Sequence, residues 1–309
     1  MTFSHHFDYH KIGAMQNQPN TFFKYMTAKV AKIVLINHTL RWSSPLLFDD
    51  PFDVLRNFNL GFDIEEIIQP AVNEVIKLIY RRVTSGIRST PFIEKNWKRL
   101  QKLNSAQRDM ILSSRLPKFI RHVIKLNNEK SKKQWTKFIP EFRILCLSEI
   151  CDNLLMWSLY SDSHKGAVIE LQCINELDSA WLEAQPVTYQ DSPPILATKQ
   201  EWIKHITEQN PLDVYQWKFY EPCTITKTTD WAYQKEWRIV SFSRPGESGH
   251  YSDYRFSPRE VRSVYLGCEM SDENANDIIS LLKYNLNHVK VYQGKKIEHE
   301  RKLSFDRIR

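Results

Sequence analysis

The chain has 309 residues, an apolar fraction of 42% and a formal net charge of +7. This composition excludes an intrinsically disordered chain, and the length allows one large domain or one domain with an insertion. The longest apolar runs, such as residues 30–36, are far shorter than the roughly 20 residues that span a bilayer. The sequence therefore predicts a soluble, cytoplasmic protein that makes no contact with a membrane.

The first helical pattern covers residues 64–80, where apolar side chains recur at helical spacing and Pro70 should kink or restart the helix. Further helical patterns follow up to residue 140. From residue 81 to 143 there are seventeen Lys or Arg against four acidic residues, a local charge of +13. We expect residues 60–140 to be a helical basic insertion between two parts of an α+β core, 1–59 and 141–309.

Short strand-like runs follow this segment. Their β-branched and aromatic content and their turn-residue boundaries predict strands at "RILCLS" (143–148), "AVIEL" (167–171), "CTITKT" (223–228), "WRIVSF" (237–242), "VRSVYLG" (261–267) and "VKVYQ" (289–293). A helix capped by Ser271 is expected at 272–282, and residues 244–253 have the composition of a mobile loop. The order of these elements predicts an α+β fold with mixed, mainly antiparallel sheets.

Cysteine and glycine usage narrows the chemistry. The five cysteines form no C-x-x-C pair, which favours reduced thiols over a disulfide framework or a zinc site and gives no support to a catalytic cysteine. The eight glycines build neither G-x-G-x-x-G nor G-x-x-x-x-G-K-[ST], which argues against a Rossmann or P-loop phosphate site. In "LRWSSPLLFDDPFD" (40–53), three carboxylates could hold a metal ion, but a Ser-Pro turn followed by an Asp-Asp-Pro turn is favoured. We expect no metal.

Two segments carry candidate site residues. In "DNLLMWSLYSDSHKG" (152–166), Asp152 or Asn153 should cap a helix that carries Trp157 and Tyr160, and His164 should follow where the helix ends. In "DWAYQKEWRIV" (230–240), a strand would point Glu236 and Arg238 to one face. Such a pair is either a surface ion pair or, in a cleft, a pair that orients a phosphate or activates a hydroxyl.

Four blocks, in this order, resemble the bacterial family known as domain of unknown function 2971: "LRWSSPLLFDDPFD", "LCLSEICDNLLMWSLYSDSHKGAVIEL", "DWAYQKEWRIV" and "VRSVYLGCEMSDENANDIISLL". The resemblance covers residues 20–50 and 140–308 and not the basic segment between them. Two positions depart from the family pattern, with Asp49 in place of Asn and Leu159 in place of His. The family is met in phage-defence contexts, and its name supplies no reaction.

A weaker similarity is to ADP-ribosyltransferase folds, which also begin with an aromatic-basic-aromatic strand, here "FFKYM" (22–26), and end the site with a strand glutamate. This resemblance implies NAD as cofactor. It implies contacts of Lys24 or Arg41 with phosphate or ribose, and stacking of Trp157 or Tyr160 on nicotinamide. Glu236 would stabilise the oxocarbenium-like transition state. The residues it nominates are, for catalysis, Glu236, His164 and Tyr160, and, for the cofactor, Lys24, Tyr25, Arg41, Ser43, Trp157 and Arg238.

Two other functions remain open. One is a nucleic-acid-binding module without catalysis, in which residues 81–143 contact DNA or RNA phosphates. Its candidate contacts are Lys118, Arg121, Lys125, Lys132 and Lys133. The other is a structural or sensor protein whose tryptophan-rich blocks only fill the core. Convergence of Trp157, His164, Glu170, Glu236 and Arg238 on one cleft would favour an enzyme.

Overall fold

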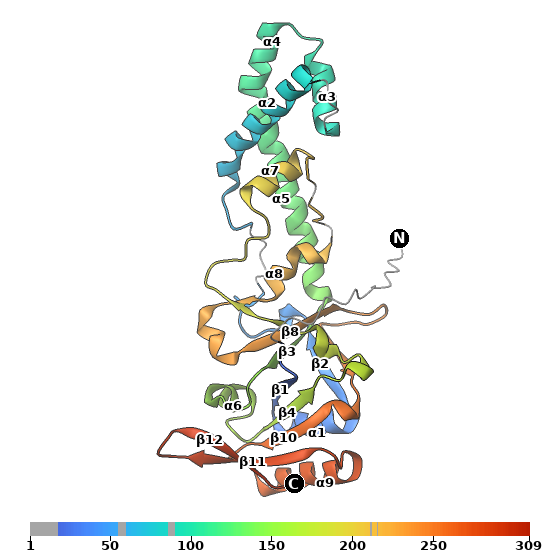
Figure 1. Cartoon of the computed structure of the whole chain (residues 1–309), viewed down its shortest axis with the longest axis vertical. Helices are drawn as coiled ribbons and strands as arrows, with labels where there is room; N and C mark the ends of the chain where they lie inside the picture. Colours follow the sequence, from blue (N-terminus) through green and yellow to red (C-terminus); the bar gives the residue numbers. More distant parts are fainter. Residues whose placement is uncertain (1–17, 55–59, 86–89, 211, 215) are drawn as a thin grey trace. The chain divides into compact units, whose positions relative to one another are not determined.

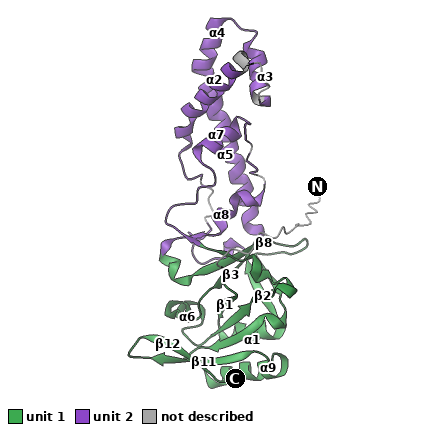
Figure 2. Ribbon diagram, viewed as in Figure 1, with its two compact units in different colours: residues 1–43, 143–187, 230–309 green, residues 44–142, 188–229 purple. Residues whose placement is uncertain are grey.

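The computed structural model describes residues 18–54, 60–85, 90–210, 212–214 and 216–309. The chain divides into two compact units, coloured separately in Figure 2. Unit 1 comprises residues 1–43, 143–187 and 230–309, and unit 2 comprises residues 44–142 and 188–229. The basic segment expected at 60–140 lies within unit 2. Unit 2 also takes in residues 188–229, which the sequence analysis assigns to the α+β core.

Unit 1 is built on one large sheet (Figure 1). Its strands are β1 (Thr21–Met26), β2 (Thr39–Ser43), β3 (Phe142–Ser148), β4 (Ala167–Gln172), β5 (Gln185–Pro186), β8 (Glu236–Phe242), β9 (Tyr251–Arg255), β10 (Val261–Leu266), β11 (Lys290–Ile297) and β12 (Lys302–Arg307). The strand order is β12-β11-β10-β4-β1-β3-β2-β9, and β8 pairs with β3 and β5. The pair β10–β11 is parallel and the pairs around it are antiparallel, so the predicted α+β class is confirmed.

Helices cover both faces of this sheet. They are α1 (Ala28–Asn37), α6 (Leu154–Tyr160) and α9 (Asp272–Asn285). Alternation along β4 separates two cores, because Ile169 joins a large cluster with α1 and α9, whereas Val168 packs with Trp157 of α6. Ser271 caps α9 as expected, its side chain accepting from the amide of Asn274.

Unit 2 is mainly helical. Its helices are α2 (Ile68–Ser85), α3 (Pro91–Leu100), α4 (Ser105–Met110), α5 (Leu116–Glu141), α7 (Lys199–Ile206) and α8 (Glu221–Thr224), and its two short strands are β6 (Thr188–Tyr189) and β7 (Thr226–Lys227). A 3-10 turn at Ile64–Ile67 precedes α2, and Pro70 lies in the first turn of α2, where proline is tolerated. A second apolar cluster, made of residues from α2, α3, α5 and α7, forms its core. In the described part of the chain, no helix is both long and apolar enough to cross a membrane.

Two predicted elements were wrong. Of the strand expected at 223–228, only Thr226–Lys227 is strand, and residues 223–224 belong to helix α8. Pro222 lies in the first turn of that helix, and its carbonyl oxygen accepts a hydrogen bond from Thr226 Oγ1 at 2.7 Å. The stretch expected to be a loop, 244–253, includes the start of β9. That strand pairs with β2 along its whole length, from Thr39↔Arg255 to Ser43↔Tyr251, so long-range pairing overrides the local composition.

Candidate active site

The predicted pair of Glu236 and Arg238 lies on β8. Period-two alternation turns both side chains to one face, while Trp237 and Ile239 enter the large core of unit 1. Arg238 Nε donates to Glu236 Oε1 at 2.7 Å, and the two side chains are 0% and 5% exposed. A weak surface pair is thereby excluded, since both charges are removed from water and depend on each other.

Lys24 of β1 reaches the same place from the neighbouring strands. Its Nζ donates to the carbonyl oxygen of Cys146 on β3 at 2.8 Å. The Cys146 thiol lies within electrostatic range of the pair. Burial and, to a smaller extent, the Glu236 carboxylate raise the thiol pKa to about 12, against the opposing charges of Arg238 and Lys24. The thiol is thus protonated at neutral pH, and Lys24 lies near it together with Glu236 and Arg238, which are more than 200 positions away from Lys24 in the sequence.

Tyr160 approaches β8 from α6. Asn153 caps this helix through the amide of Met156, at 3.0 Å, and also donates to the carbonyl oxygen of Tyr233 at 3.2 Å. The Tyr160 hydroxyl accepts from Gln234 Nε2 at 2.7 Å, and Gln234 is buried two residues before Glu236. We call Lys24, Tyr160, Gln234, Glu236 and Arg238 the β8 cluster. Within it Tyr160 is the half-exposed member from the helix, at 38%.

Sequence reasoning missed Gln234 and Cys146. Gln234 ends a 3-10 helix, Thr229–Gln234, and Lys235 has a positive φ before β8 begins, so strand alternation gave no signal for Gln234. Cys146 lies inside the predicted strand 143–148, but its neighbours Glu236 and Lys24 come from other strands. All five cysteines are free, and burial is the main cause that raises the thiol pKa at each of them.

Trp157 and Tyr25, two of the predicted cofactor residues, are packed into the second core of unit 1. The Trp157 indole is fully buried, and its Nε1 donates to the carbonyl oxygen of Cys151 at 2.7 Å. Tyr25 meets it edge-on at 5.6 Å between ring centroids and donates its hydroxyl to the carbonyl oxygen of Ile150. A ligand ring would stack on Trp157 only by displacing these neighbours.

His164 stacks on Trp157 at 6.3 Å with an angle of 10° between the rings. Its Nε2 lies 3.1 Å from Ser158 Oγ, and burial lowers its pKa, so the imidazole is neutral at pH 7. Asp162, Ser163 and His164 all have positive φ, between 49° and 66°. Three consecutive non-glycine residues in this region store backbone strain, which often accompanies functional sites.

Glu170 is separate from this turn and accepts a hydrogen bond from the Tyr265 hydroxyl at 3.2 Å.

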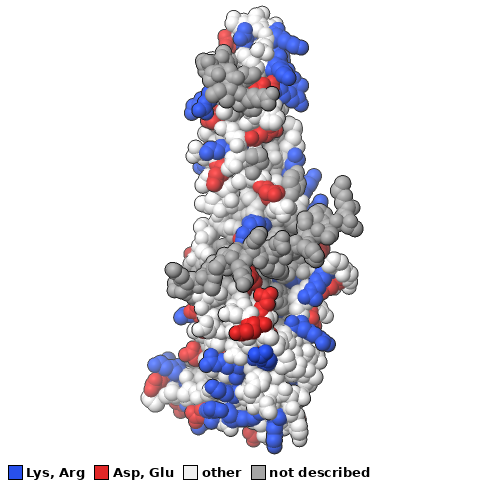
Figure 3. Space-filling model, turned by 45° about the vertical axis from the view of Figure 1, so that its right-hand side comes forward, with Lys and Arg blue, Asp and Glu red and all other residues white. Residues whose placement is uncertain are grey.

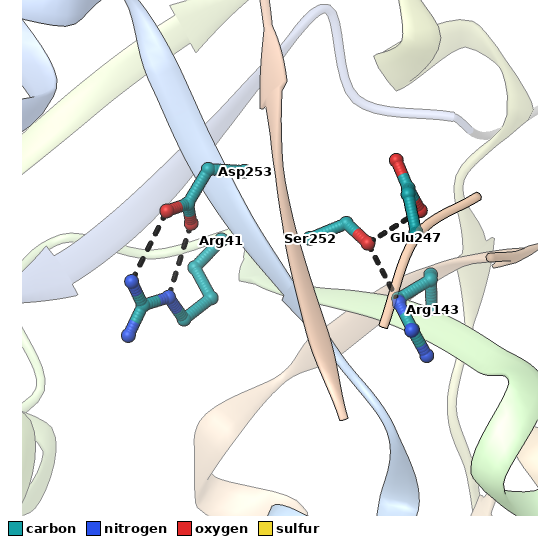
Figure 4. A network of polar contacts seen from close by, with 5 residues as sticks. All are labelled: Arg41, Arg143, Glu247, Ser252 and Asp253. Atoms are coloured by element: carbon teal, nitrogen blue, oxygen red, sulfur yellow. Dashed lines mark hydrogen bonds and ion pairs between the residues drawn. The ribbon is translucent and has the colours of Figure 1, made fainter. Parts of the chain in front are cut away.

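Arg41 and Ser43 lie on β2 beside the edge strand β9. Figure 4 shows the Arg41 guanidinium holding both oxygens of Asp253, at 3.0 and 3.1 Å. The same guanidinium stacks on the Tyr251 ring, 3.8 Å from its centroid. Arg41 is therefore engaged within the β2–β9 ribbon, and Ser43 pairs in register with Ile144 of β3.

The same ribbon carries a second polar network that the sequence did not indicate. The buried Arg143 donates to Ser252 Oγ at 2.8 Å and to the carbonyl oxygen of Gly249 at 2.9 Å. Ser252 in turn donates to Glu247 at 2.6 Å, as Figure 4 shows. These contacts hold the segment before β9 against β3.

The five predicted nucleic-acid contacts are all exposed on α5 of unit 2. Arg121 pairs with Glu65 at 3.0 Å and Lys132 with Glu129 at 3.2 Å, and both pairs are about half exposed. Within the described residues, Lys118, Lys125 and Lys133 form no ion pair. Figure 3 shows lysine and arginine side chains over the helical part of unit 2, with acidic side chains between them.

Comparison with known proteins gave one match. Searches of the curated proteins and of the solved structures found no significant similarity. One protein-family model matches residues 156–239, the segment that runs from α6 to the middle of β8 and carries Tyr160, Glu236 and Arg238. This match supports assignment of that segment to the family described as protein of unknown function (DUF2971).

Proposed function

We propose that unit 1 is an ADP-ribosyltransferase-like enzyme that uses NAD or a related nucleotide to modify a macromolecule. The observation that carries this proposal is the β8 cluster. It holds the Glu236 carboxylate at 2.7 Å from a buried guanidinium and joins β8, through Gln234, to the half-exposed phenol of Tyr160. Buried charged groups that are brought together from separate elements are typical of active sites.

The proposed reaction breaks the bond between ribose C1′ and the nicotinamide nitrogen. Nicotinamide leaves with the bonding electrons, positive charge develops on the ribose, and an acceptor nucleophile bonds to C1′ and loses a proton. A carboxylate held in a water-poor site stabilises such a developing charge more strongly than one in water. Glu236 fills this role, with a hydrogen bond to a ribose hydroxyl, and Arg238 fixes the orientation of its carboxylate.

The other residues nominated for NAD divide into two groups. Lys24 and Tyr160 belong to the β8 cluster, and the proposal gives them contacts with the phosphates and with nicotinamide. The second group, Trp157, Tyr25, Arg41 and Ser43, is held by neighbours in the protein, and for these residues the proposal implies a supporting role. The family resemblance suggests that such an enzyme would act in bacterial phage defence.

The test measures NAD binding by titration calorimetry and nicotinamide release by chromatography. Glu236→Gln alone leaves Arg238 buried without its charged partner, so the informative variant is Glu236→Gln with Arg238→Gln, which removes both charges. We expect it to release nicotinamide at least about 100-fold more slowly than the wild type, the loss typical for a group that stabilises transition-state charge. Tyr160→Phe tests the phenol without disturbing the pair.

The matched control is Glu300→Gln, which removes an exposed carboxylate of unit 1. It should leave NAD turnover unchanged. A wild-type protein that neither binds NAD nor releases nicotinamide, or a folded double variant with full activity, would overturn the proposal. Circular dichroism of each variant establishes that it is folded.

A second candidate function is nucleic-acid binding by unit 2, because α5 carries a basic strip. Lys118, Lys125 and Lys132 lie within one strip of the helix surface, and Lys133 is next to it. From Lys118 to Lys133 the strip is about 22 Å long at 1.5 Å per residue, which matches roughly six nucleotides of one strand. The acidic residues within it are few, and its exposed pairs contribute little to stability.

This candidate predicts a steep salt dependence. Fluorescence anisotropy with a labelled duplex oligonucleotide at several salt concentrations should give a straight line of log K against log salt. Replacing Lys118, Lys125 and Lys133 by Gln should reduce the slope by roughly three, since each phosphate contact contributes about 0.9. The same change at three exposed lysines of unit 1, Lys283, Lys295 and Lys302, is the control. Equal slopes in the two triple variants would refute the assignment to α5.

A further inference from the structure

Unit 2 contains a cavity of about 190 Å³ that the functions proposed above do not use. It lies beside β7, which pairs in parallel with β6 through Thr188↔Thr226 and Tyr189↔Lys227. Its walls come from the turn at Phe52, the segment 190–194 and the segment 223–228. Pockets for drug-sized ligands have volumes of about 300–1,000 Å³, so this one suits a single ring system rather than a whole dinucleotide.

Phe52 stands at the mouth of the cavity. Asp50 forms the turn that presents it: Asp50 Oδ1 accepts from the amide of Phe52 at 2.8 Å, and its carbonyl oxygen accepts from the amide of Asp53 at 3.2 Å. The turn keeps the phenyl ring 68% exposed. An aromatic ring fixed at the rim of a cavity is a stacking platform for a flat ligand, because every such ligand has a π face.

The base of the cavity is not suited to an anion. Lys227 is buried there, but its Nζ pairs with Asp53 Oδ2 at 3.2 Å, and both side chains are less than one-tenth exposed. The ammonium charge is therefore already compensated. Cys223 adds an uncharged wall, since burial raises its thiol pKa to about 12. With Pro194 also buried at this wall, the cavity favours a neutral ring over a phosphate.

The polar rim offers acceptors. Asp191 lines the cavity, and its Oδ1 accepts from the amide and the hydroxyl of Thr229, at 3.0 and 2.7 Å, so Oδ2 is the oxygen left as a candidate acceptor. These hydrogen bonds lower the pKa of Asp191, so the acceptor is charged at neutral pH. Gln190 Nε2 donates to the carbonyl oxygen of Ser192 at 2.8 Å, so Gln190 Oε1 is a second acceptor at the rim. The Thr226 hydroxyl donates to the carbonyl oxygen of Pro222 at 2.7 Å. These two donors are directed to the chain, and the Asp191 carboxylate can only accept, so this side of the rim favours a ligand that donates.

We propose that this cavity binds a nucleobase that carries an exocyclic amino group, with the ring stacked on Phe52 and the amino group donating to Asp191. The ribose would leave through the open mouth, so the base could belong to a free nucleoside or to a strand. All residues involved belong to unit 2. The proposal therefore stands without the transferase activity of unit 1 and without the basic strip of α5.

The experiment compares nucleosides that differ only in the amino group. Guanosine and inosine form one matched pair, and adenosine and purine riboside form the other. Saturation-transfer NMR and titration calorimetry on the full chain should show that the amino-bearing member of each pair binds at least about tenfold more tightly, because its amino group forms a charge-assisted hydrogen bond with the exposed Asp191 carboxylate that the matched nucleoside cannot form. Equal affinities within both pairs, or no binding of any nucleoside at millimolar concentration, would overturn the proposal.

Two variants locate the site. Phe52→Ala removes the stacking platform from an exposed position, so the protein should fold, and adenosine and guanosine should each bind about tenfold more weakly or worse. Asp191→Asn keeps an oxygen for Thr229 and replaces the second acceptor by a donor, so the preference for guanosine over inosine should disappear. Phe119→Ala, an exposed aromatic of the same unit on α5, is the control. Loss of binding in Phe119→Ala equal to that in Phe52→Ala would refute the assignment.

Discussion

Replacing Glu236 by Gln should destabilise the protein far more than the loss of an ordinary ion pair. Arg238 is fully buried and its Nε lies 2.7 Å from the carboxylate, so the substitution leaves a positive charge in a site that water does not reach. Breaking a buried pair in this way costs about 3–5 kcal/mol, and Arg238→Met should cost a similar amount. The exposed pair of Lys295 and Asp306 gives the comparison: Lys295→Met should cost ~0–1 kcal/mol.

Urea denaturation measures the coupling energy between Glu236 and Arg238. It is applied to the wild type, to both single variants and to the double variant Glu236→Gln/Arg238→Met. Since the double variant buries no unpaired charge, it should lose less stability than the sum of the single variants, with a coupling energy of at least about 2 kcal/mol. Additive losses would refute the buried pair as described. A stable double variant is also the right background for the NAD assay, because any loss of turnover then reports on chemistry rather than on folding.

Two further predictions concern backbone packing and pH. Gly267→Ala places a methyl group onto the backbone carbonyl of His164 and should lower the free energy of unfolding by at least ~2 kcal/mol. Gly246→Ala meets no neighbour and should lower it by about 1 kcal/mol, because Gly246 has a positive φ. Thermal unfolding of the two variants should show this order of stability. His205 Nδ1 accepts from the amide of Leu212 at 2.8 Å, and burial lowers its pKa. As the pH falls below about 6.5, His205 of the unfolded chain binds a proton before His205 of the folded chain does, so the free energy of unfolding should fall. In His205→Gln it should fall less steeply. Urea midpoints that change with pH equally in the two proteins from pH 7.5 to about 5.5 would contradict this.

Local periodicity was enough to predict the parts of the site that lie on one element. Alternation along 236–239 gave the common face of Glu236 and Arg238, and the cap before Leu154 was expected at Asp152 or Asn153, of which Asn153 is the one. These features depend on φ/ψ geometry and on neighbours within four residues, which the sequence contains.

Contacts between residues that lie far apart in the sequence could not be predicted. Lys24 reaches Cys146 across 122 positions of the chain, and Tyr160 reaches Gln234 across 74. Burial was equally hidden, because a Glu and Arg at alternate positions have the same sequence pattern on a surface as in a core. The strand at 251–255 was missed for the same reason: its partner is β2, and its own composition is that of a loop.

The convergence that would favour an enzyme is found only in part, and this shapes the proposed mechanism. Trp157 and His164 stack on each other in one core, whereas Glu236 and Arg238 pair on β8, and Tyr160 is joined to β8 through Gln234. A nicotinamide ring would therefore meet the Tyr160 phenol before the buried indole. The proposal places Tyr160 on the route of the ligand to Glu236, so Tyr160→Phe and Tyr160→Ala should differ: the first loses one hydrogen bond, and the second loses the surface on which the ring would stack. If both variants bound NAD as the wild type does, the cofactor would have to approach Glu236 by another route.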